Sequence, residues 1–479
     1  MNVYLIVIVA YFAFVTLISL VTKKAASKSA ASFLIAGRNL GVITCAIVVA
    51  AEWLGGMSTI GVSEKAFKTG TLQPILYNIA TAAGMIIIGF TVARHYRERG
   101  VFTVSEMFRS IFGSKCQQYS AYAFLIAYIT LAFVQLQTCA SVVAPLFNIN
   151  WTWAVIISSA IITIYTYIGG MHALAITGII HLTAMFLGLG VALVVGFIDI
   201  VKLSGSLSLG ELLIAKDSPT DWYNPFSFNF SEAFSLLLGG VLGGMAGQAS
   251  IQPIFAAKDA PTAKKAAVLS GFIVAPFGII VGLLALFAKT GLFFDPDSIK
   301  NAKMILPTLL TNENFINPIL GGIALSGILA AILSTVAPVN FAVVTIAAKD
   351  IYHAFINKNA DDKKVTETAK QLVILVNFIT IPLAIIMKGE ILDTAYISYA
   401  IRSIGAIVLI FGLYKKNWIS ANSVKLAFIG GSIVTLVFVV LQKYNIFDFD
   451  KTYAAIISAL IFITIGNLYS TYKYKQAKQ

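Results

Sequence analysis

Two charged residues lie inside long apolar runs of the sequence, where a charge is costly and is usually retained for a function. Glu52 lies in the run 41–61, and Arg402 lies in the run 391–414. We interpret them either as one ion pair that braces two helices or as groups that meet a solute. Opposite charges suit an amino acid or another zwitterion, and an unpaired Arg402 suits a small organic acid. An internal pair leaves a neutral solute equally open.

Two apolar runs are interrupted by adjacent glycines and are expected to form broken helices. The run 50–59 has a glycine pair, a carboxylate and two hydroxyls, and the run 239–253 has glycine pairs, two glutamines and a proline. An interrupted helix at membrane depth normally lines a cavity or an ion site, because its backbone polar groups must be satisfied. Glycine pairs that merely permit close helix packing are the alternative. The two interruptions lie five runs apart, at matching positions of two halves, which favours a site.

Polar and aromatic residues near these breaks are the candidates for solute binding. They are Glu52, Trp53, Ser58, Tyr77, Asn78, Gln248, Gln252 and Arg402. The two glutamines have an alternative role, which is to satisfy the backbone of the broken helix. His181 also lies inside an apolar run, where a hydrogen-bonded structural histidine is favoured over a proton relay.

Ser334 and Thr335 form an adjacent hydroxyl pair within the run 314–357. Such hydroxyls commonly bond back to a carbonyl one turn earlier in the same helix. Sodium, however, is a hard cation that suits hydroxyl and carbonyl oxygens. The broken helix at 50–59 offers free carbonyls of that kind, so the pair is compatible with a sodium site, although alone it is weak support.

The elements that must position these residues are membrane helices. Hydrophobic residues make up 58% of the 479 residues, charged residues make up 11%, and the mean hydropathy is +0.86. Soluble globular proteins carry about 25% charged residues, and a hydrocarbon core of about 30 Å needs roughly 20 apolar residues per helix. The runs that meet this length rule are 3–22, 41–61, 72–95, 117–147, 150–170, 173–200, 230–255, 265–292, 314–357, 366–388, 391–414, 420–441 and 450–473.

We therefore expect an all-α polytopic membrane protein with about thirteen transmembrane helices. With the N-terminus outside and the C-terminus in the cytoplasm, about two thirds of the 34 Lys and Arg residues fall in cytoplasmic loops, as the positive-inside rule predicts. The formal charge of +13 then reflects topology, since no basic domain is large enough to hold nucleic acid. We expect a multi-pass protein of the cell membrane, surrounded by lipid, with no obligatory protein partner.

Four ordered motifs resemble those of the sodium:solute symporter family, over most of the chain. They lie at 33–40, which includes a Gly-Arg pair, at 165–173, at 240–252, and at 329–335 with a continuation to 352. The run 53–56, Trp-Leu-Gly-Gly, is most similar to the choline-transporter branch of that family.

The resemblance implies a single transporter domain over 1–479, built as an inverted repeat of two five-helix halves with broken helices at the centre. The first repeat would be 41–200 and the second 230–414, with peripheral spans and tails at 1–40 and 415–479. The resemblance also implies a sodium site. Carried over residue by residue, that site consists of the carbonyls of Ala51, Leu54 and Ala331 and the hydroxyls of Ser334 and Thr335.

Three features depart from the family pattern. Gly178 stands where many members have Asp, and Ala337 and Pro338 stand where some members supply hydroxyls to a second sodium ion. We therefore predict a single sodium and one-to-one coupling. Gly247 precedes Gln248 where the choline-like branch has an aromatic residue. The change weakens an aromatic cage for a quaternary ammonium and disfavours choline as the substrate.

The predicted function is sodium-coupled symport of a small organic solute by alternating access, with sodium as the coupling ion and no organic cofactor. Coupling requires that the ion and the solute prefer the same conformation. One alternative is a proton-coupled transporter of the same fold in which Glu52 carries the proton. Another is a membrane sensor that has lost transport. An enzyme is disfavoured, because the apolar runs contain no nucleophile–base set or metal cluster.

Overall fold

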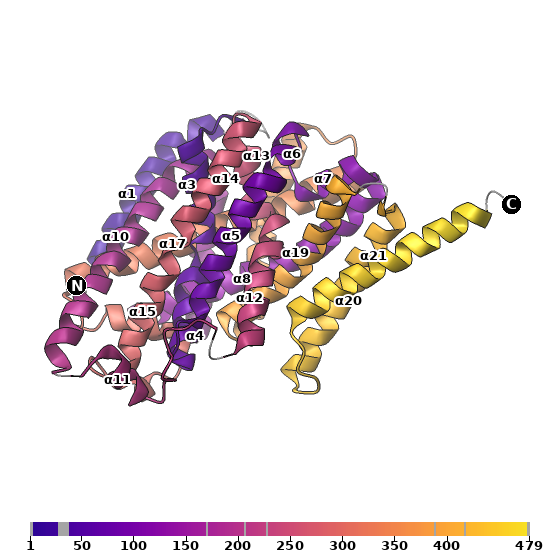
Figure 1. The fold of residues 1–479 in the computed structure, drawn as a ribbon. Helices are drawn as coiled ribbons and strands as arrows, with labels where there is room; N and C mark the ends of the chain where they lie inside the picture. The colour runs from indigo at the N-terminus through magenta and orange to yellow at the C-terminus, as the bar shows by residue number, and fades with distance from the viewer. Residues whose placement is uncertain are drawn as a thin grey trace.

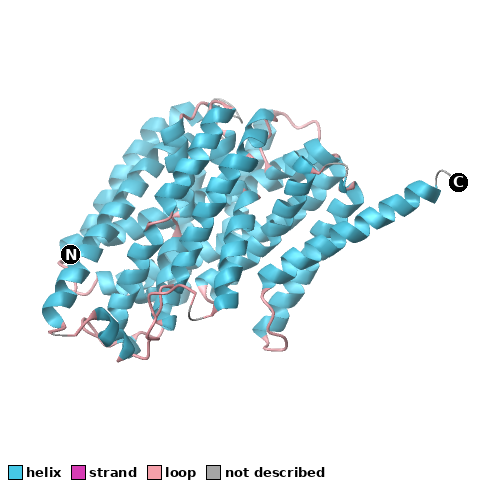
Figure 2. Cartoon of the chain, viewed as in Figure 1, coloured by secondary structure: helices cyan, strands magenta, loops and turns pink. Residues whose placement is uncertain are grey.

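The computed structural model describes residues 3–26, 38–168, 171–205, 207–226, 229–387, 389–415 and 418–476. Within these ranges all regular elements are helices (Figure 2). Helices suit such an apolar chain because each satisfies its backbone polar groups internally, as lipid requires.

Each predicted span coincides with one helix or with consecutive helices. In chain order these are α1 (Val3–Ala26), α3 (Val42–Trp53) with η2 (Met57–Gly61) and α4 (Val62–Thr69), η3 (Gln73–Ile75) with α5 (Leu76–Thr91), α8 (Ser114–Phe147), α9 (Trp151–Ile168), α10 (Met171–Leu203), α12 (Phe230–Met245) with α13 (Gln248–Phe255), α14 (Ala260–Val274) with α15 (Phe277–Lys289), α17 (Pro318–Thr345) with η6 (Ile346–Ile356), α18 (Asp362–Ile386), α19 (Ile391–Tyr414), α20 (Ala421–Lys443) and α21 (Lys451–Gln476). The connections contain α6 (Ala93–Glu98), α7 (Val104–Phe112), α11 (Leu209–Ile214), η4 (Pro296–Ser298), η5 (Ala302–Met304) and α16 (Ile305–Leu310).

The length and composition of these helices fit a membrane protein. Among the described residues, nine helices are long and apolar enough to cross a membrane, or eleven if each bent pair is one span. Two shorter apolar helices, Val3–Ile18 and Trp151–Ile164, lie in the other two predicted ranges. The all-helical membrane class is confirmed, and the count of thirteen crossings stays a prediction.

The two bent helix pairs lie inside the bundle. α3 packs against α10, α14 and α17, and α12 packs against α5 and α19. α20 and α21 pack against each other at one edge, where α21 extends away from the body toward the C-terminus (Figure 1). Residues 50–66 and 243–257, which include the two bends, are all buried.

Both predicted interruptions are real bends of the backbone. The axis turns by 53° between α3 and the helical stretch from Met57 to Thr69, and by 41° between α12 and α13. A Cβ on Gly55 would lie 1.9 Å from Thr335 Oγ1, and one on Gly56 would lie 2.2 Å from Thr138 Oγ1. The glycine pair at the first bend therefore also permits close approach of α17 and α8.

Candidate functional site

The first bend releases backbone carbonyls that meet the hydroxyl pair of α17. Ser334 Oγ lies 2.7 Å from the carbonyl oxygen of Ala51 and 2.8 Å from that of Ala331. Thr335 Oγ1 lies 2.7 Å from the carbonyl oxygen of Glu52 and 3.3 Å from that of Ala331. Both hydroxyl side chains are buried. The hydroxyls thus bond across to α3 as well as back to their own helix.

Four of the five predicted sodium ligands are thereby brought together. Ala51, Ala331, Ser334 and Thr335 contribute oxygens to one cluster, and the carbonyl of Glu52 joins them although the sequence did not single it out. The fifth, Leu54, directly follows α3, where the backbone leaves helical geometry at φ −84° and ψ 57°. Clustered carbonyl and hydroxyl oxygens are ligands that suit a hard cation.

The second bend places Gln248 in a different setting from the one expected. Gln248 Oε1 accepts a hydrogen bond from Val104 N at 2.7 Å, and its Nε2 donates to Phe102 O at 3.1 Å. The amide is fully buried and fastens the start of α7 to α13. This contact supports the alternative role of satisfying backbone groups, although those groups belong to another segment. Gln252, one turn later, is also buried.

Glu52 and Arg402 are both buried, with 6% and 2% of their surface exposed. Between these two described side chains there is no ion pair within 4.0 Å, so of the two alternatives the direct ion pair is not formed in this structure. Instead Arg402 Nη1 donates to the hydroxyl of Tyr128 at 3.2 Å. The guanidinium carbon lies 4.2 Å from the ring centre of Tyr399.

Aromatic side chains pack together beside the first bend. The ring centre of Tyr399 lies 6.1 Å from that of Trp53, 6.0 Å from that of Tyr77 and 4.9 Å from that of Tyr396. The hydroxyls of Tyr77 and Tyr399 are 2.8 Å apart. These contacts join the first bend to α5 and α19 through Tyr399.

Two predicted residues bond to each other rather than standing apart. Asn78 Nδ2 donates to Ser58 Oγ at 3.2 Å, and Ser58 Oγ lies 2.9 Å from the carbonyl oxygen of Trp53. This chain of contacts joins α5 to the first bend. His181 forms a hydrogen bond with the hydroxyl of Tyr11 at 2.6 Å, which agrees with its expected structural role.

The sequence argument missed Tyr128, Tyr396 and Tyr399. A usable signal was present in α19, where Tyr396, Tyr399 and Arg402 recur at three-residue intervals and so lie along one face of the helix. Tyr128 carries no comparable signal, because it is one of several aromatic residues within the long apolar helix α8.

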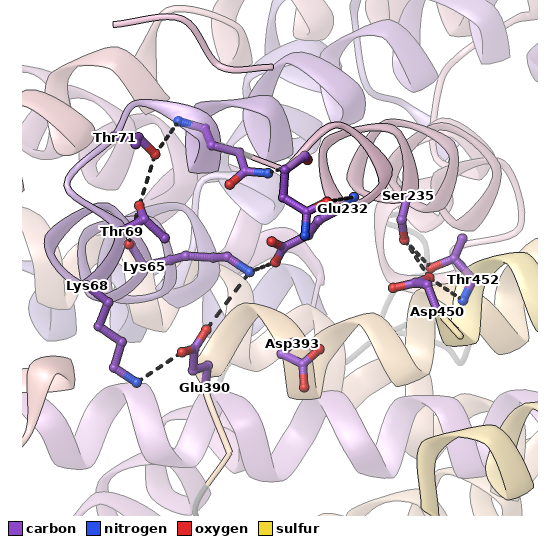
Figure 3. A network of polar contacts seen from close by, with 12 residues as sticks. Lys65, Lys68, Thr69, Thr71, Glu232, Ser235, Glu390, Asp393, Asp450 and Thr452 are labelled. Atoms are coloured by element: carbon purple, nitrogen blue, oxygen red, sulfur yellow. Dashed lines mark hydrogen bonds and ion pairs between the residues drawn. The ribbon is translucent and has the colours of Figure 1, made fainter. Parts of the chain in front are cut away.

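One end of the two bent helices is joined by a group of paired charges, Lys65, Lys68, Glu232 and Glu390, which we call the Lys65 cluster. Figure 3 shows Lys65 between Glu232 and Glu390, with Lys68 beside Glu390. Lys65 forms an ion pair with Glu232 and lies 4.0 Å from Glu390, while Lys68 lies 3.0 Å from Glu390. A cavity of about 590 Å³ adjoins the cluster between α4, α12, α19, α20 and α21. The cluster thereby connects both bent helices to the start of α19.

At the opposite end of the bent helices, neutral donors surround one carboxylate on a neighbouring element. Asp350, which is fully buried on η6, accepts hydrogen bonds from Thr103 Oγ1 and Gln117 Nε2, each at 2.8 Å. Backbone bonds between Leu40 and the 256–258 segment lie beside α13. In this structure, polar contacts therefore connect the bent helices to neighbouring elements at both ends.

The chain is similar in sequence to a known family of proteins and to several of its members. The model of the sodium:solute symporter family matches residues 33–461. High affinity choline transporter 1 of Homo sapiens is 23% identical over 360 residues, which are 71% of this chain and only 59% of that protein. The sodium/proline symporter of Haemophilus influenzae is 24% identical over 430 residues, or 84% of this chain and 82% of that protein.

The fold of this chain is similar to that of a solved structure. A sodium-coupled sialic acid symporter in a substrate-bound outward-open state superposes with a TM-score of 0.80 at 16% identity. The superposition covers 98% of this chain and 97% of that chain. It shows the inverted-repeat fold with broken helices that the sequence predicted.

Proposed function

The chain belongs to the sodium:solute symporter family, and from that premise we propose that it carries a small organic solute together with sodium by alternating access. The family is one of transporters rather than enzymes. The observation that carries the proposal is the oxygen cluster in which the hydroxyls of Ser334 and Thr335 meet the carbonyls released at the first bend. We assign the two repeats to 41–200 and 230–414, and the protein to the cell membrane with its N-terminus outside.

In the proposed mechanism sodium binds the carbonyls of Ala51, Leu54 and Ala331 and the hydroxyls of Ser334 and Thr335. To admit the ion, each hydroxyl turns its hydrogen away and presents an oxygen lone pair instead. The ion then holds α3 and α17 together through shared ligands. The conformation in which these two helices are close is thereby favoured, and a solute that prefers the same conformation is coupled to the ion.

We propose a stoichiometry of one sodium per solute. Ala337 and Pro338 offer no hydroxyl for a second ion. A Cβ on Gly178 would lie 3.7 Å from Cβ of Ala51, so the position where many relatives have Asp adjoins the oxygen cluster. Glycine there adds no carboxylate. All five proposed ligands are therefore neutral oxygens.

Thermal stability tests the sodium site. Purified protein is unfolded in sodium, lithium, potassium and choline chlorides at constant ionic strength, because a ligand that binds only the folded state raises its apparent stability. We expect stabilisation by sodium but not by potassium, and its loss in the double variant Ser334→Ala with Thr335→Ala. Equal stability in sodium and potassium chloride would reject the proposal.

Proton coupling is a second candidate, because of one feature of Glu52. Its carboxylate oxygen Oε2 is buried and has no hydrogen-bond partner among the described residues. A buried carboxylate without a partner is a reasonable proton carrier. Stabilisation that ignores sodium and grows as the pH is lowered, and that disappears in Glu52→Gln, would favour this candidate over sodium coupling.

A further inference from the structure

The guanidinium of Arg402 has one occupied edge and one free edge. Nη1 donates to Tyr128, whereas Nε and Nη2 are buried and have no hydrogen-bond partner in the part of the protein that the structure describes. In a planar guanidinium, Nε–H and one Nη2–H point in the same direction along one edge. Such an edge binds a carboxylate through two parallel hydrogen bonds. The free groups are thus a matched pair of donors.

Arg402 is held in place by aromatic faces. Its guanidinium carbon lies 4.2 Å from the ring centre of Tyr399 and 5.4 Å from that of Tyr128. These distances are those of a cation–π interaction, the kind that recognises quaternary ammonium ligands. Here the protein itself supplies the cation that the rings hold. An aromatic surface already covered by a guanidinium is poorly suited to an ammonium solute. The guanidinium itself attracts an anion.

Gly247 provides the space that this arrangement requires. A Cβ at that position would lie 2.9 Å from Nη1 of Arg402 and 2.5 Å from Oγ of Ser250. From the resemblance to the choline-like branch, an aromatic residue would be expected at position 247, where this chain has glycine. The aromatic residue expected from that pattern and the buried guanidinium therefore exclude each other, and this chain has the guanidinium.

Further unpartnered groups belong to the first bend. The indole Nε1 of Trp53 and Oε2 of Glu52 are both buried, with no hydrogen-bond partner among the described residues. No ion pair joins Glu52 to Arg402. Glu52 therefore lacks a hydrogen-bond donor, and the free edge of Arg402 lacks an acceptor. A solute that carries both an anionic group and a donor group can meet both needs.

We propose that the free edge of Arg402 binds the carboxylate of the transported solute, and that the substrates are small carboxylates with an amine or hydroxyl donor for Glu52. This proposal rests on the symport function proposed above. It assigns Arg402 as the residue that determines specificity for an anionic group. It also explains why a buried arginine is tolerated with two free donors, since the solute supplies their acceptors.

Matched pairs of solutes test the proposal in the wild-type protein. Binding is measured by thermal shift in saturating sodium chloride, using proline with prolinamide, alanine with alaninamide and lactate with lactamide, and choline as a cationic probe. We expect at least one carboxylate to bind, with its amide about 30-fold weaker or more, as expected when a buried charged partner is lost. Choline should not bind. Equal binding of a carboxylate and its amide, binding of choline, or binding of none of the carboxylates would overturn the proposal.

Variants assign the effect to Arg402. Arg402→Gln should weaken carboxylate binding by about 30-fold or more, and Arg402→Lys should restore it only in part, because a lysine keeps the charge but lacks the two-donor edge. Arg94→Gln is the matched control, since Arg94 is exposed on α6 and pairs with Glu98. Unchanged carboxylate affinity in Arg402→Gln would contradict the assignment.

Stabilisation of the protein by sodium distinguishes failure of the symport proposal from failure of the proposed role of Arg402. If wild-type protein shows no sodium-selective stabilisation, the symport function itself fails. If sodium stabilises the protein but carboxylate and amide bind alike, only the role of Arg402 fails. Persisting sodium stabilisation in Arg402→Gln shows that the variant is folded. If that variant does not fold, the comparison of carboxylates with amides in the wild-type protein still decides the proposal.

Discussion

The Lys65 cluster and the Glu52–Arg402 region contain similar charges in opposite states of pairing. The carboxylates and ammonium groups of the Lys65 cluster contact one another. The Glu232, Glu390 and Lys68 side chains are 29%, 32% and 43% exposed, and Lys65, with 9% of its side chain exposed, is buried against the two carboxylates. Glu52 and Arg402 are almost fully buried, yet they do not pair with each other. Partly exposed pairs contribute about 0–1 kcal/mol, whereas a buried unpaired charge costs several kcal/mol.

This difference indicates what each region does. Ion pairs whose carboxylates remain partly hydrated hold α4, α12 and the start of α19 together. An unpaired buried charge requires a partner from outside the protein or a compensating site. The paired region is therefore suited to joining elements, and the unpaired region to binding an ion or a solute.

A large effect on the Arg402 site is expected from a single methyl group at Gly247. Gly247→Ala places a Cβ 2.9 Å from Arg402 Nη1, so the guanidinium must move. We expect a loss of stability of about 1–3 kcal/mol, typical of overpacking, together with weaker carboxylate binding. Urea unfolding and thermal shift measure the two effects.

Gly244→Ala is the matched control for that variant. A Cβ at Gly244 would lie 3.4 Å from the ring of Trp53, which is close to ordinary contact. The control should therefore bind carboxylates nearly as the wild type does. If Gly247→Ala behaves like Gly244→Ala, the space at position 247 is not needed by Arg402.

A double-mutant cycle tests whether Glu52 and Arg402 are truly unpaired. We expect Glu52→Gln and Arg402→Gln to have nearly additive effects on the free energy of unfolding without solute, with a coupling energy below about 1 kcal/mol, because no hydrogen bond joins them. Removing one partner of a buried ion pair typically costs 3–5 kcal/mol. A coupling energy in that range would show that the two side chains pair in solution.

The smallest expected effect is at the Lys65 cluster. Lys68→Gln should lower the free energy of unfolding by about 1 kcal/mol or less, and the difference from wild type should shrink in high salt, since the partly exposed Lys68–Glu390 pair is screened. Glu390→Gln should give a similar change and a similar salt dependence, because Lys65 keeps Glu232 as its closer partner. A salt-independent loss of several kcal/mol in either variant would show that the charges of this cluster behave like the buried charges of the Glu52–Arg402 region.

The sequence predicts the helices well, because membrane helices depend on local composition. All thirteen apolar ranges coincide with helices, and both glycine-rich interruptions are bends. The convergence of Ser334 and Thr335 on the first bend follows from the family resemblance rather than from their spacing. Composition and motif position are thus sufficient for the arrangement of helices and for the location of the proposed sodium site.

The sequence does not predict the partners of the buried side chains, because these depend on which helices meet. Whether Glu52 and Arg402 pair is decided by the distance between α3 and α19. Gln248 is engaged by the backbone before α7, which is more than a hundred residues earlier in the chain. The tyrosines around Arg402 are indistinguishable from packing residues until α8 and α19 are brought together.

Equilibrium binding of radioactive sodium to the purified protein tests the central claim most directly. The account predicts one sodium per chain, displaced by unlabelled sodium but not by potassium. It also predicts loss of that binding in the Ser334→Ala, Thr335→Ala double variant, while Gly244→Ala binds sodium as the wild type does. Two sodium ions per chain, no sodium at all, or unchanged binding in the double variant would contradict it.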